Sequence, residues 1–395
     1  MFDFDKPVDR FGTNSYKYDK MPNRDVIPLW VADMDFETAP CITDALRKRL
    51  EHGCFGYTQV PESFYEATMS WFKRRHGWQI ERQWFIYTIG VVPAISAIIK
   101  AMTKPGDRVL VQTPVYNCFF SSIRNNSCQI AESQLISIEE PDGTLRFAID
   151  WAHFERQCAD EKTTLFLLCN PHNPAGRVWT ADELRCMGEI CHRHNVFIIS
   201  DEIHCEFVNP ALERGYVPFA TVASDRNYAV CVSPSKAFNI AGLQIANIIA
   251  PDADVRERVD KAININEVCD VNPFGVIALQ AAYSAEGEQW LTELNEYIYA
   301  NYEWAAEFIR KNLPEWKVTR LEGTYLMWVD VSATGKTGDE LTAHLLYDCG
   351  VYVNAGSMYG DKAGNNYIRI NLATQRDRLK KALESTTSTA ELPTP

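Results

Sequence analysis

The feature that most limits the fold is a series of short apolar runs in the middle of the chain, separated by segments of helical periodicity. Each run has only a few residues and ends in turn or polar residues, as buried strands do. The runs are RVLVQTP (108–114), TLFLLCNP (164–171), VFIISDE (196–202), NYAVCVSP (227–234) and QIANIIA (244–250). Helical patterns precede the first run, as at 92–102, and separate the runs, as at 182–194. This order predicts an α/β fold whose mostly parallel central sheet is flanked by helices on both faces.

The pattern changes near residue 286, where long helical segments replace the alternation and are followed by short strands and a final helix around 375–384. We therefore expect a large domain over 46–285 and a smaller α/β domain over 286–384. Residues 1–45, rich in Pro, Asp and aromatic side chains, are expected to pack on the small domain. The tail 385–395 lacks apolar periodicity and is expected to be disordered.

The charge of the chain argues against two classes of partner. Lys plus Arg number 39 and Asp plus Glu number 52, which gives a formal net charge of -13. Such a chain is repelled by phosphate backbones and by anionic lipid, so nucleic acid and membranes are not expected partners. The chain has no basic region followed by an apolar run at its start, and no apolar stretch approaches the roughly 18 residues of a membrane helix. A cytoplasmic location is expected.

The cysteines offer one candidate metal site, within DELRCMGEICHRHN. Its possible ligands are Cys186, Cys191, His192 and His194. The same segment has apolar residues at three- and four-residue spacing and a basic last turn, which is typical of an ordinary amphipathic helix. The chain has no C-x-x-C pair, and its cysteines are scattered through apolar segments, as in a reducing compartment. We therefore expect a helix here and no metal.

Polar residues with a common chemical purpose follow the predicted buried strands. The strand ends read NPHNPAG, SDEIH and SPSK, and they carry Asn173, Asp201 and Lys236. In a parallel sheet, the carboxyl ends of the strands meet at one edge and form the usual place for a site. An amine, a carboxylate and a carboxamide together suit pyridoxal 5'-phosphate: Lys236 would form an imine with its aldehyde, Asp201 would pair with its ring nitrogen, and Asn173 would donate to its phenolate oxygen.

Each of these residues also has an ordinary interpretation. A lysine after SPS is usually exposed to solvent, Asn173 before Pro174 is a common turn signal, and Asp201 could cap a helix. The joint pattern favours the cofactor, because the three residues occur together at the ends of separate buried strands.

The motifs NPHNPAG, SDEIH and SPSKAFN, in this order, resemble those of fold-type I pyridoxal-phosphate enzymes of the class I/II aminotransferase family. The resemblance extends to about residue 384. It is greatest for the MalY/PatB group of C–S β-lyases, through WVADMDF (30–36), YTQVPESF (57–64), DEIHCEF and SKAFNIAGL. It implies a homodimer with active sites at the subunit interface.

The phosphate of such a cofactor has an expected position at the segment YTIGVVPAISAI. A strand ends at Gly90 and a helix begins directly after it, so the backbone N–H groups of Val91 and Val92 lie at a helix N-terminus, where anions bind. Ser233 and Ser235 are expected to add hydroxyl donors.

The resemblance also implies contacts for other residues. Tyr116 matches the aromatic residue that stacks on the pyridine ring, and Tyr57 matches one that reaches the phosphate from the neighbouring subunit. Arg369 matches the arginine that binds the substrate carboxylate, and Ala32 and Asp33 in WVADMDF are expected near the substrate. The two tyrosines could instead be core or interface aromatics, and Arg369 could be an internal ion-pair partner.

The chain departs from the wider family at several positions. Gln244 stands where many aminotransferases have an arginine for the phosphate, and His204 stands where many have a tyrosine; it is expected to support the cofactor site or simply to pack. Asn117 replaces a residue that is more often aromatic or acidic in the C–S lyases, so the leaving-group contacts there are open.

Three functions are compatible with these residues. The resemblance favours a β-lyase that cleaves cystathionine, cysteine or another S-substituted cysteine to a thiol, pyruvate and ammonia, with Lys236, Asp201 and Tyr116 as catalytic residues. An aminotransferase for aromatic or aliphatic amino acids would use the same lysine. A cofactor-binding regulator without catalysis is the third, and the complete set of catalytic residues argues against it.

Overall fold

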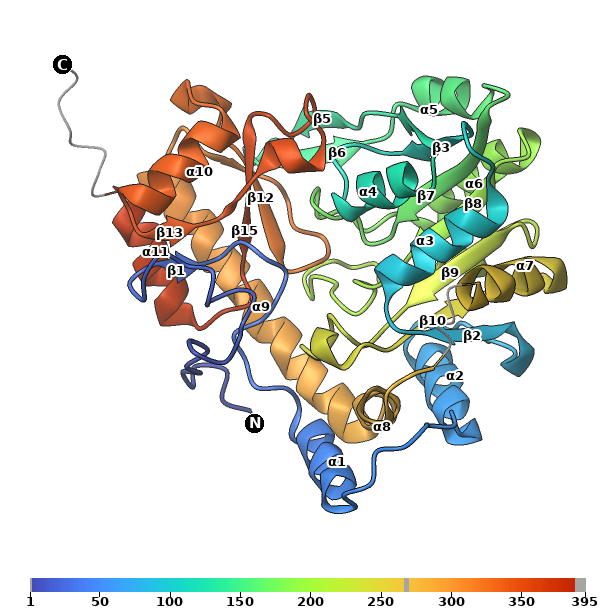
Figure 1. Cartoon of the computed structure of the whole chain (residues 1–395). Coiled ribbons are helices and arrows are strands. Elements are labelled where there is room, and N and C mark those ends of the chain that lie inside the picture. Colours follow the sequence, from blue (N-terminus) through green and yellow to red (C-terminus); the bar gives the residue numbers. More distant parts are fainter. Residues whose placement is uncertain (1, 266–269, 388–395) are drawn as a thin grey trace.

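The computed structural model describes residues 2–265 and 270–387. Its larger part is a seven-stranded sheet in the order β2-β10-β9-β8-β7-β3-β4 (Figure 1). The strands are β2 (Phe85–Thr88), β3 (Arg108–Val111), β4 (Gln129–Glu132), β7 (Thr163–Cys169), β8 (Phe197–Asp201), β9 (Tyr228–Val232) and β10 (Ala246–Ile249). β10 runs opposite to all the other strands of this sheet, and the remaining pairs are parallel, so the predicted mostly parallel sheet is confirmed.

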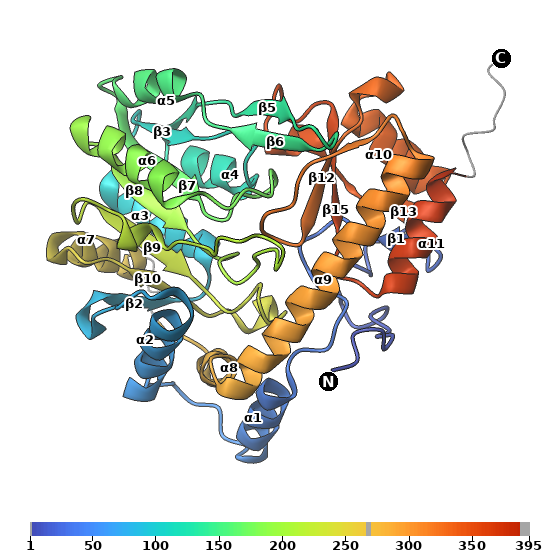
Figure 2. The ribbon, with the colours of Figure 1, turned by 180° about the vertical axis from the view of Figure 1, so that it is seen from behind.

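The sheet separates two apolar cores, which explains why its strands are apolar on both faces. Along β3, Val109 and Val111 belong to one core and Leu110 to the other. One face is covered by α3 (Val91–Met102), α4 (Cys118–Asn125) and α7 (Ala253–Asn264), and the other by α5 (Trp151–Cys158) and α6 (Ala181–Arg193) (Figures 1 and 2). A strand buried between two helical layers has no solvent face, so its sequence does not alternate.

The alternative that the sequence analysis weighed for α6, a metal site, is not supported by the positions of its side chains. Cys191 is buried in the core, whereas His192 pairs with Asp225 on the surface. Thr180 caps the helix through a capping box with Glu183. The segment is therefore the amphipathic helix that its periodicity predicts.

The smaller part is built on a four-stranded sheet in the order β11-β12-β15-β14. The strands are β11 (Lys317–Val318), β12 (Leu326–Asp330), β14 (Asn354–Ala355) and β15 (Tyr367–Asn371), and the flanking helices are α10 (Gly338–Tyr347) and α11 (Arg376–Thr387). The long helix α9 (Ala285–Asn312) begins beside α8 (Pro273–Ala282) and ends against α11, so it connects the two parts (Figure 2). The boundary at 285/286 remains a prediction, and most of the predicted tail 385–395 lies outside the described residues.

The N-terminal segment crosses between the two parts. Its strand β1 (Ile27–Pro28) pairs in parallel with β13 (Val351–Tyr352) of the smaller part. Its helix α1 (Pro40–Glu51) instead packs on α8 of the larger part. The next helix, α2 (Glu62–His76), also packs on α8. Residues 29–39 therefore pass between the two sheets. Within the described residues, no helix combines the length and apolarity needed to cross a bilayer.

Candidate active site

A cavity of about 380 Å³ lies where β7, β8 and β9 end, at the carboxyl edge of the large sheet. Most of the residues predicted from the sequence line it: Ala32, Val91, Val92, Tyr116, Asn173, Asp201, His204, Ser235, Lys236 and Arg369. The sheet thus brings together side chains that lie far apart in the sequence, as the strand-end argument predicted.

Lys236 follows β9 and projects its amine into this cavity. Its Nζ donates a hydrogen bond to the carbonyl of Ala32, at 2.7 Å. Burial lowers the pKa of Lys236, because an ammonium group loses its hydration there. A lysine in this environment gives up its proton more readily than a surface lysine and is a better nucleophile and base.

Asp201 is the last residue of β8 and is buried. Burial raises the pKa of Asp201 to about 7. One carboxylate oxygen accepts from the backbone N–H of Ile203 at 3.1 Å, and no cation of the described residues forms an ion pair with it. Turns follow β8, so Asp201 does not cap a helix. Its carboxylate is therefore placed to receive a positively charged group of a ligand.

Arg369 reaches the same cavity from β15 of the smaller sheet. Its two terminal nitrogens donate to Asn173 Oδ1 at 3.1 Å and to the carbonyl of Trp30 at 3.0 Å. The guanidinium lies over the ring of Tyr359, 4.7 Å from its centre. No acidic side chain within the described ranges pairs with Arg369, so its charge is available for an anion.

The segment expected to bind the phosphate forms the start of α3, which begins at Val91 after Gly90 as predicted; the phosphate contact itself stays a prediction. Val91, Val92 and Ser235 line the cavity. The structure differs from the expectation for Ser233, whose hydroxyl donates to the carbonyl of Ile245 at 2.6 Å and does not line the cavity. Ser233 instead contacts the Ser235 hydroxyl at 2.6 Å and helps to orient it.

His204 and Tyr116 also line the cavity. Burial, with a smaller effect from the charges of Lys236 and Arg369, lowers the pKa of His204 well below its ordinary value, so the ring is neutral. Its Nδ1 is buried and has no hydrogen-bond partner in the described part of the chain, although the ring packs edge-on against Tyr325. Burial raises the pKa of Tyr116 well above its ordinary value, so its phenol stays protonated.

Two other predicted residues lie outside the cavity. Asp33 forms an ion pair with Arg10 at 2.7 Å and does not line the cavity. Its charge still acts on the site, because it opposes the lowering of the Lys236 pKa by burial. Tyr57 is 98% exposed. Its predicted contact concerns a neighbouring subunit and stays a prediction.

The segment 30–36 is held in place by two carboxamide side chains, that of Asn239 in SKAFNIAGL and that of Asn371 at the end of β15. Asn239 accepts from the N–H of Met34 at 3.1 Å and donates to its carbonyl at 3.0 Å. Asn371 donates to the carbonyls of Val31 and Asp33, both at 2.8 Å. These bonds fix the backbone whose Trp30 and Ala32 carbonyls receive Arg369 and Lys236, which explains why WVADMDF and SKAFN occur together.

Several lining residues were missed by sequence reasoning. They are Tyr16, Cys118, Asn354, Met358 and Tyr359. Asn354 donates to the carbonyl of Trp30 at 2.8 Å and to the Tyr359 hydroxyl at 2.9 Å. Apart from Cys118, which follows TPVYN, these residues come from segments without a motif, so no sequence signal pointed to them.

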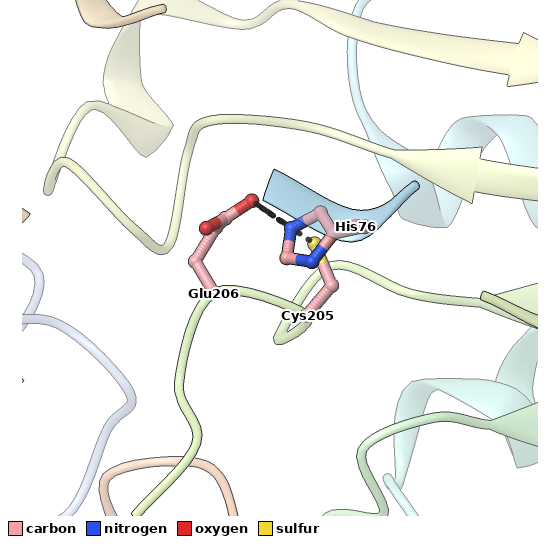
Figure 3. Close-up of side chains that lie close together, drawn as sticks. All are labelled: His76, Cys205 and Glu206. Carbon is pink, nitrogen blue, oxygen red and sulfur yellow. Dashed lines mark hydrogen bonds and ion pairs between the residues drawn. The ribbon is translucent and has the colours of Figure 1, made fainter. Parts of the chain in front are cut away.

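A second cluster of possible metal ligands lies apart from the cavity. Within the described residues, only His76, Cys205 and Glu206 place such atoms within 4.8 Å of one another (Figure 3). Glu206 is already occupied: its oxygens accept from Arg75 at 2.8 Å, from Trp71 at 2.7 Å and contact His76 at 2.8 Å. Burial opposes ionisation, but the charges of His76 and Arg75 and these hydrogen bonds lower the pKa of Glu206 to about 2. The cluster ties α2 to the loop after β8.

Replacing Glu206 by Gln should lower the free energy of unfolding at pH 7 by about 3 kcal/mol, since it leaves partly buried cations without their carboxylate. A carboxylate with a depressed pKa stabilises the fold above its ordinary pKa and loses this effect as the pH falls towards about 2. Urea denaturation of the two proteins should therefore differ most near pH 7. Glu213→Gln, in an exposed nearby loop, is the matched control. If both variants lose the same free energy of unfolding, the stabilising role of the Glu206 cluster is contradicted.

The comparisons with known proteins agree with this geometry. The family model described as aminotransferase class I and II matches residues 24–385. Cystathionine beta-lyase PatB of Bacillus subtilis is 40% identical over 96% of this chain and 98% of its own length. Protein MalY of Escherichia coli is 33% identical over 97% of each chain. The crystal structure of cystalysin from Treponema denticola, which contains pyridoxal 5'-phosphate, has a TM-score of 0.93 and 32% identity, covering 99% of both chains.

These matches confirm the predicted fold class and the resemblance to the MalY/PatB group, because they extend over nearly the whole chain at identities that reflect common descent. The chain belongs to the class I and II aminotransferase family.

Proposed function

We propose that this chain is a pyridoxal-phosphate-dependent C–S β-lyase, which cleaves S-substituted cysteines to a thiol, pyruvate and ammonia. The observation that carries the proposal is the meeting of Lys236, Asp201, Asn173 and Arg369 around one cavity. The similarity to PatB, a cystathionine beta-lyase, supports elimination over transamination.

The cavity fits pyridoxal 5'-phosphate in its donors and acceptors. The buried Asp201 carboxyl without a cation suits a protonated ring nitrogen, and the unpartnered His204 Nδ1 offers a further polar contact. Val91 and Val92 at the start of α3 suit a phosphate. When bound, this cofactor supplies an aldehyde for Lys236 and a ring that accepts the electron pair released at the substrate α-carbon.

Each functional side chain of the cavity would then have its own role in the reaction. Arg369 would bind the substrate carboxylate through two parallel N–H donors and so orient the α-carbon. The amine of Lys236, whose pKa is lowered by burial and which lies beside the Ala32 carbonyl, would take the α-proton as general base. Asp201 would hold a proton at the ring nitrogen. Loss of the sulfur substituent from the β-carbon would follow, and Lys236 or Tyr116, whose phenol stays protonated, would donate a proton to the sulfur.

Elimination and transamination differ in what they require. The proposal predicts pyruvate and thiol from L-cystathionine with no 2-oxo acid present, measured by coupled lactate dehydrogenase and a thiol reagent. β-Chloro-L-alanine, a small substrate with a good leaving group, should also give pyruvate. Product formation only after a 2-oxo acid is added, with a new amino acid and no pyruvate, would instead establish the aminotransferase.

Arg369→Lys should lower kcat/KM for cysteine conjugates by about 100-fold, mainly through a higher KM, because an ammonium group cannot form the bidentate pair. Steady-state kinetics of pyruvate release measures this. Arg320→Lys, which changes an exposed arginine of the same domain, is the matched control. An unchanged KM in Arg369→Lys would remove this residue from carboxylate binding.

We further propose that the protein is a cytoplasmic homodimer with active sites at the interface. Exposed apolar side chains gather on α1 and the loop after it: Leu50 is 59% exposed, Phe55 49% and Tyr57 98%. Clusters of this kind are typical of protein interfaces. The described cysteines are all free thiols, which suits a reducing compartment. Sedimentation should give the mass of two chains, and a monomer that retains full activity would refute the shared site.

A further inference from the structure

A cluster of charged side chains lies beside residues 30–36, and the proposed function gives it no role. Lys17 and Asp35 are buried and form an ion pair at 2.9 Å. Arg10 pairs with Asp33 at 2.7 Å, and these two side chains are 20% and 27% exposed. None of the four lines the active-site cavity. The N-terminal segment is therefore attached to residues 30–36 through paired charges and not through apolar contacts alone.

The cluster fixes the residue directly after the carbonyl that holds Lys236. That carbonyl belongs to Ala32 and accepts from Lys236 Nζ at 2.7 Å. The main chain of Asp33 is held as well, because its carbonyl accepts from Lys17 Nζ at 2.9 Å. The Asp33 carboxylate accepts from both terminal nitrogens of Arg10, at 3.0 and 2.7 Å. Arg10 thus fixes a negative charge one residue away from the acceptor of the Lys236 amine.

The Asp33 carboxylate acts on Lys236 although it lies outside the cavity lining. Burial lowers the pKa of Lys236, and among the effects that oppose this lowering the charge of Asp33 is the largest, ahead of that of Asp201. An anion favours a positive charge on a nearby nitrogen. The other titratable or charged groups near Lys236 in the described part of the chain are Arg369, Cys118, His204 and Tyr116.

Arg10 is itself charged and bound to this anion. Burial opposes the charge of Arg10, but Asp33 and Asp35 together hold the pKa of Arg10 above its ordinary value. A cation that binds a carboxylate weakens the field of that carboxylate at other sites. The effect of Asp33 on the catalytic lysine therefore depends on Arg10.

We propose that Arg10 is a positioning residue for Lys236: it holds the Asp33 carboxylate in place and offsets part of its charge, and so limits how strongly Asp33 favours a positive charge on the Lys236 nitrogen. The inference rests on the proposed attachment of the cofactor to Lys236. Substitutions at the two ends of one ion pair should then act on Lys236 in opposite directions.

The test is a pH titration of the visible absorption of the protein loaded with pyridoxal 5'-phosphate. This absorption depends on whether the nitrogen that joins the cofactor to Lys236 is protonated. Asp33→Asn removes the anion and should lower the midpoint by on the order of half a pH unit, a modest shift because the ion pair is partly exposed. Arg10→Met removes the offsetting cation and should raise the midpoint by a similar amount. Arg10→Lys keeps the charge and should stay close to the unmodified protein.

The opposite signs separate this role from a merely structural one. Both substitutions break the same ion pair, so a role in packing alone would move both midpoints in one direction or leave both unchanged. Either of these results would overturn the proposal. If Arg10→Met does not fold, Asp33→Asn is compared with the double variant Arg10→Gln/Asp33→Asn, which leaves neither charge unpaired. The double variant should have the higher midpoint, and an equal midpoint would refute the role of Arg10.

A second ion pair of the same segment provides the matched control. Arg24 and Asp9 lie 3.5 Å apart, with side chains 67% and 69% exposed. Arg24→Met and Asp9→Asn change the net charge by the same amounts as the test variants, and both should leave the midpoint unchanged, since solvent and salt screen exposed charges. Shifts as large as those of the test variants would show a general effect of net charge and contradict the proposal.

Failure of the cofactor attachment is distinguishable from failure of this inference. If Lys236→Ala retains the same titrating absorption, the cofactor is not attached to Lys236, and both proposals are refuted. An absorption that requires Lys236, with midpoints that do not move in opposite directions, refutes only the role of Arg10.

Discussion

Replacement of Lys236 by alanine should lower kcat for pyruvate release by about 10⁴-fold or more, because it removes both the nucleophile for the cofactor aldehyde and the base for the α-proton. The amine is buried and donates to a backbone carbonyl, and no other lysine among the described residues lines the cavity to replace it. Steady-state assays with β-chloro-L-alanine measure the loss directly.

Two controls make this result specific to Lys236. Lys336→Ala, at an exposed position before α10, should retain full activity. Circular dichroism of Lys236→Ala should match the unmodified protein, since removing a buried ammonium group relieves a desolvation cost. Activity within tenfold of the unmodified enzyme would exclude Lys236 as the catalytic base.

Replacement of Asp201 by alanine should lower kcat by about 10³-fold, the effect of losing one preorganised electrostatic partner. Without the carboxylate the ring nitrogen loses its proton, and the electron pair at the substrate α-carbon is less well accepted. Cofactor affinity should fall as well, which equilibrium dialysis measures. A rate equal to that of the unmodified enzyme would remove Asp201 from the mechanism.

The same residue makes a second prediction that does not depend on activity. Burial raises the pKa of Asp201 to about 7, from 3.8. The cofactor-free folded chain therefore holds a proton that the unfolded chain has released, so its stability falls as the pH rises from about 4 to about 7. Asp201→Asn removes this loss. The cofactor-free variant should be more stable at pH 8 by on the order of 4 kcal/mol, and of equal stability near pH 4.

Urea denaturation at both pH values tests this comparison. A variant that is equally stable at pH 8 would show that the Asp201 carboxylate is solvated in the cofactor-free protein. Such a result would weaken the argument that Asp201 binds the protonated ring nitrogen of the cofactor.

The parts of the fold that could be predicted from the sequence are those with no solvent face. In TLFLLC, Phe166 packs into one core and Leu167 into the other, so a continuous apolar run was sufficient to indicate a buried strand. The edge strand β4 reads QIAE and is half exposed, and every residue of β5 (Ile136–Glu139) is exposed. These strands carry a weak hydrophobic signal and were not predicted.

The residues of the candidate site also fall into a group that the sequence predicts and a group that it does not. Asn173, Asp201 and Lys236 could be placed together because parallel strands bring their carboxyl ends to one edge. Tyr16 and Met358 reach the cavity on segments whose course depends on tertiary contacts, and local sequence does not encode that course. Ser233 and Ser235 look equivalent in SPS, and only the Ile245 carbonyl decides which hydroxyl faces the cavity.

The most direct test of the central claim is to locate the covalent bond to the cofactor. The protein loaded with pyridoxal 5'-phosphate is reduced with borohydride and digested, and the peptides are analysed by mass spectrometry. We expect the pyridoxyl phosphate label on Lys236 and its loss in Lys236→Ala, with an unchanged label in Lys336→Ala. A label on another lysine, or no label on a protein that binds the cofactor, would contradict the account.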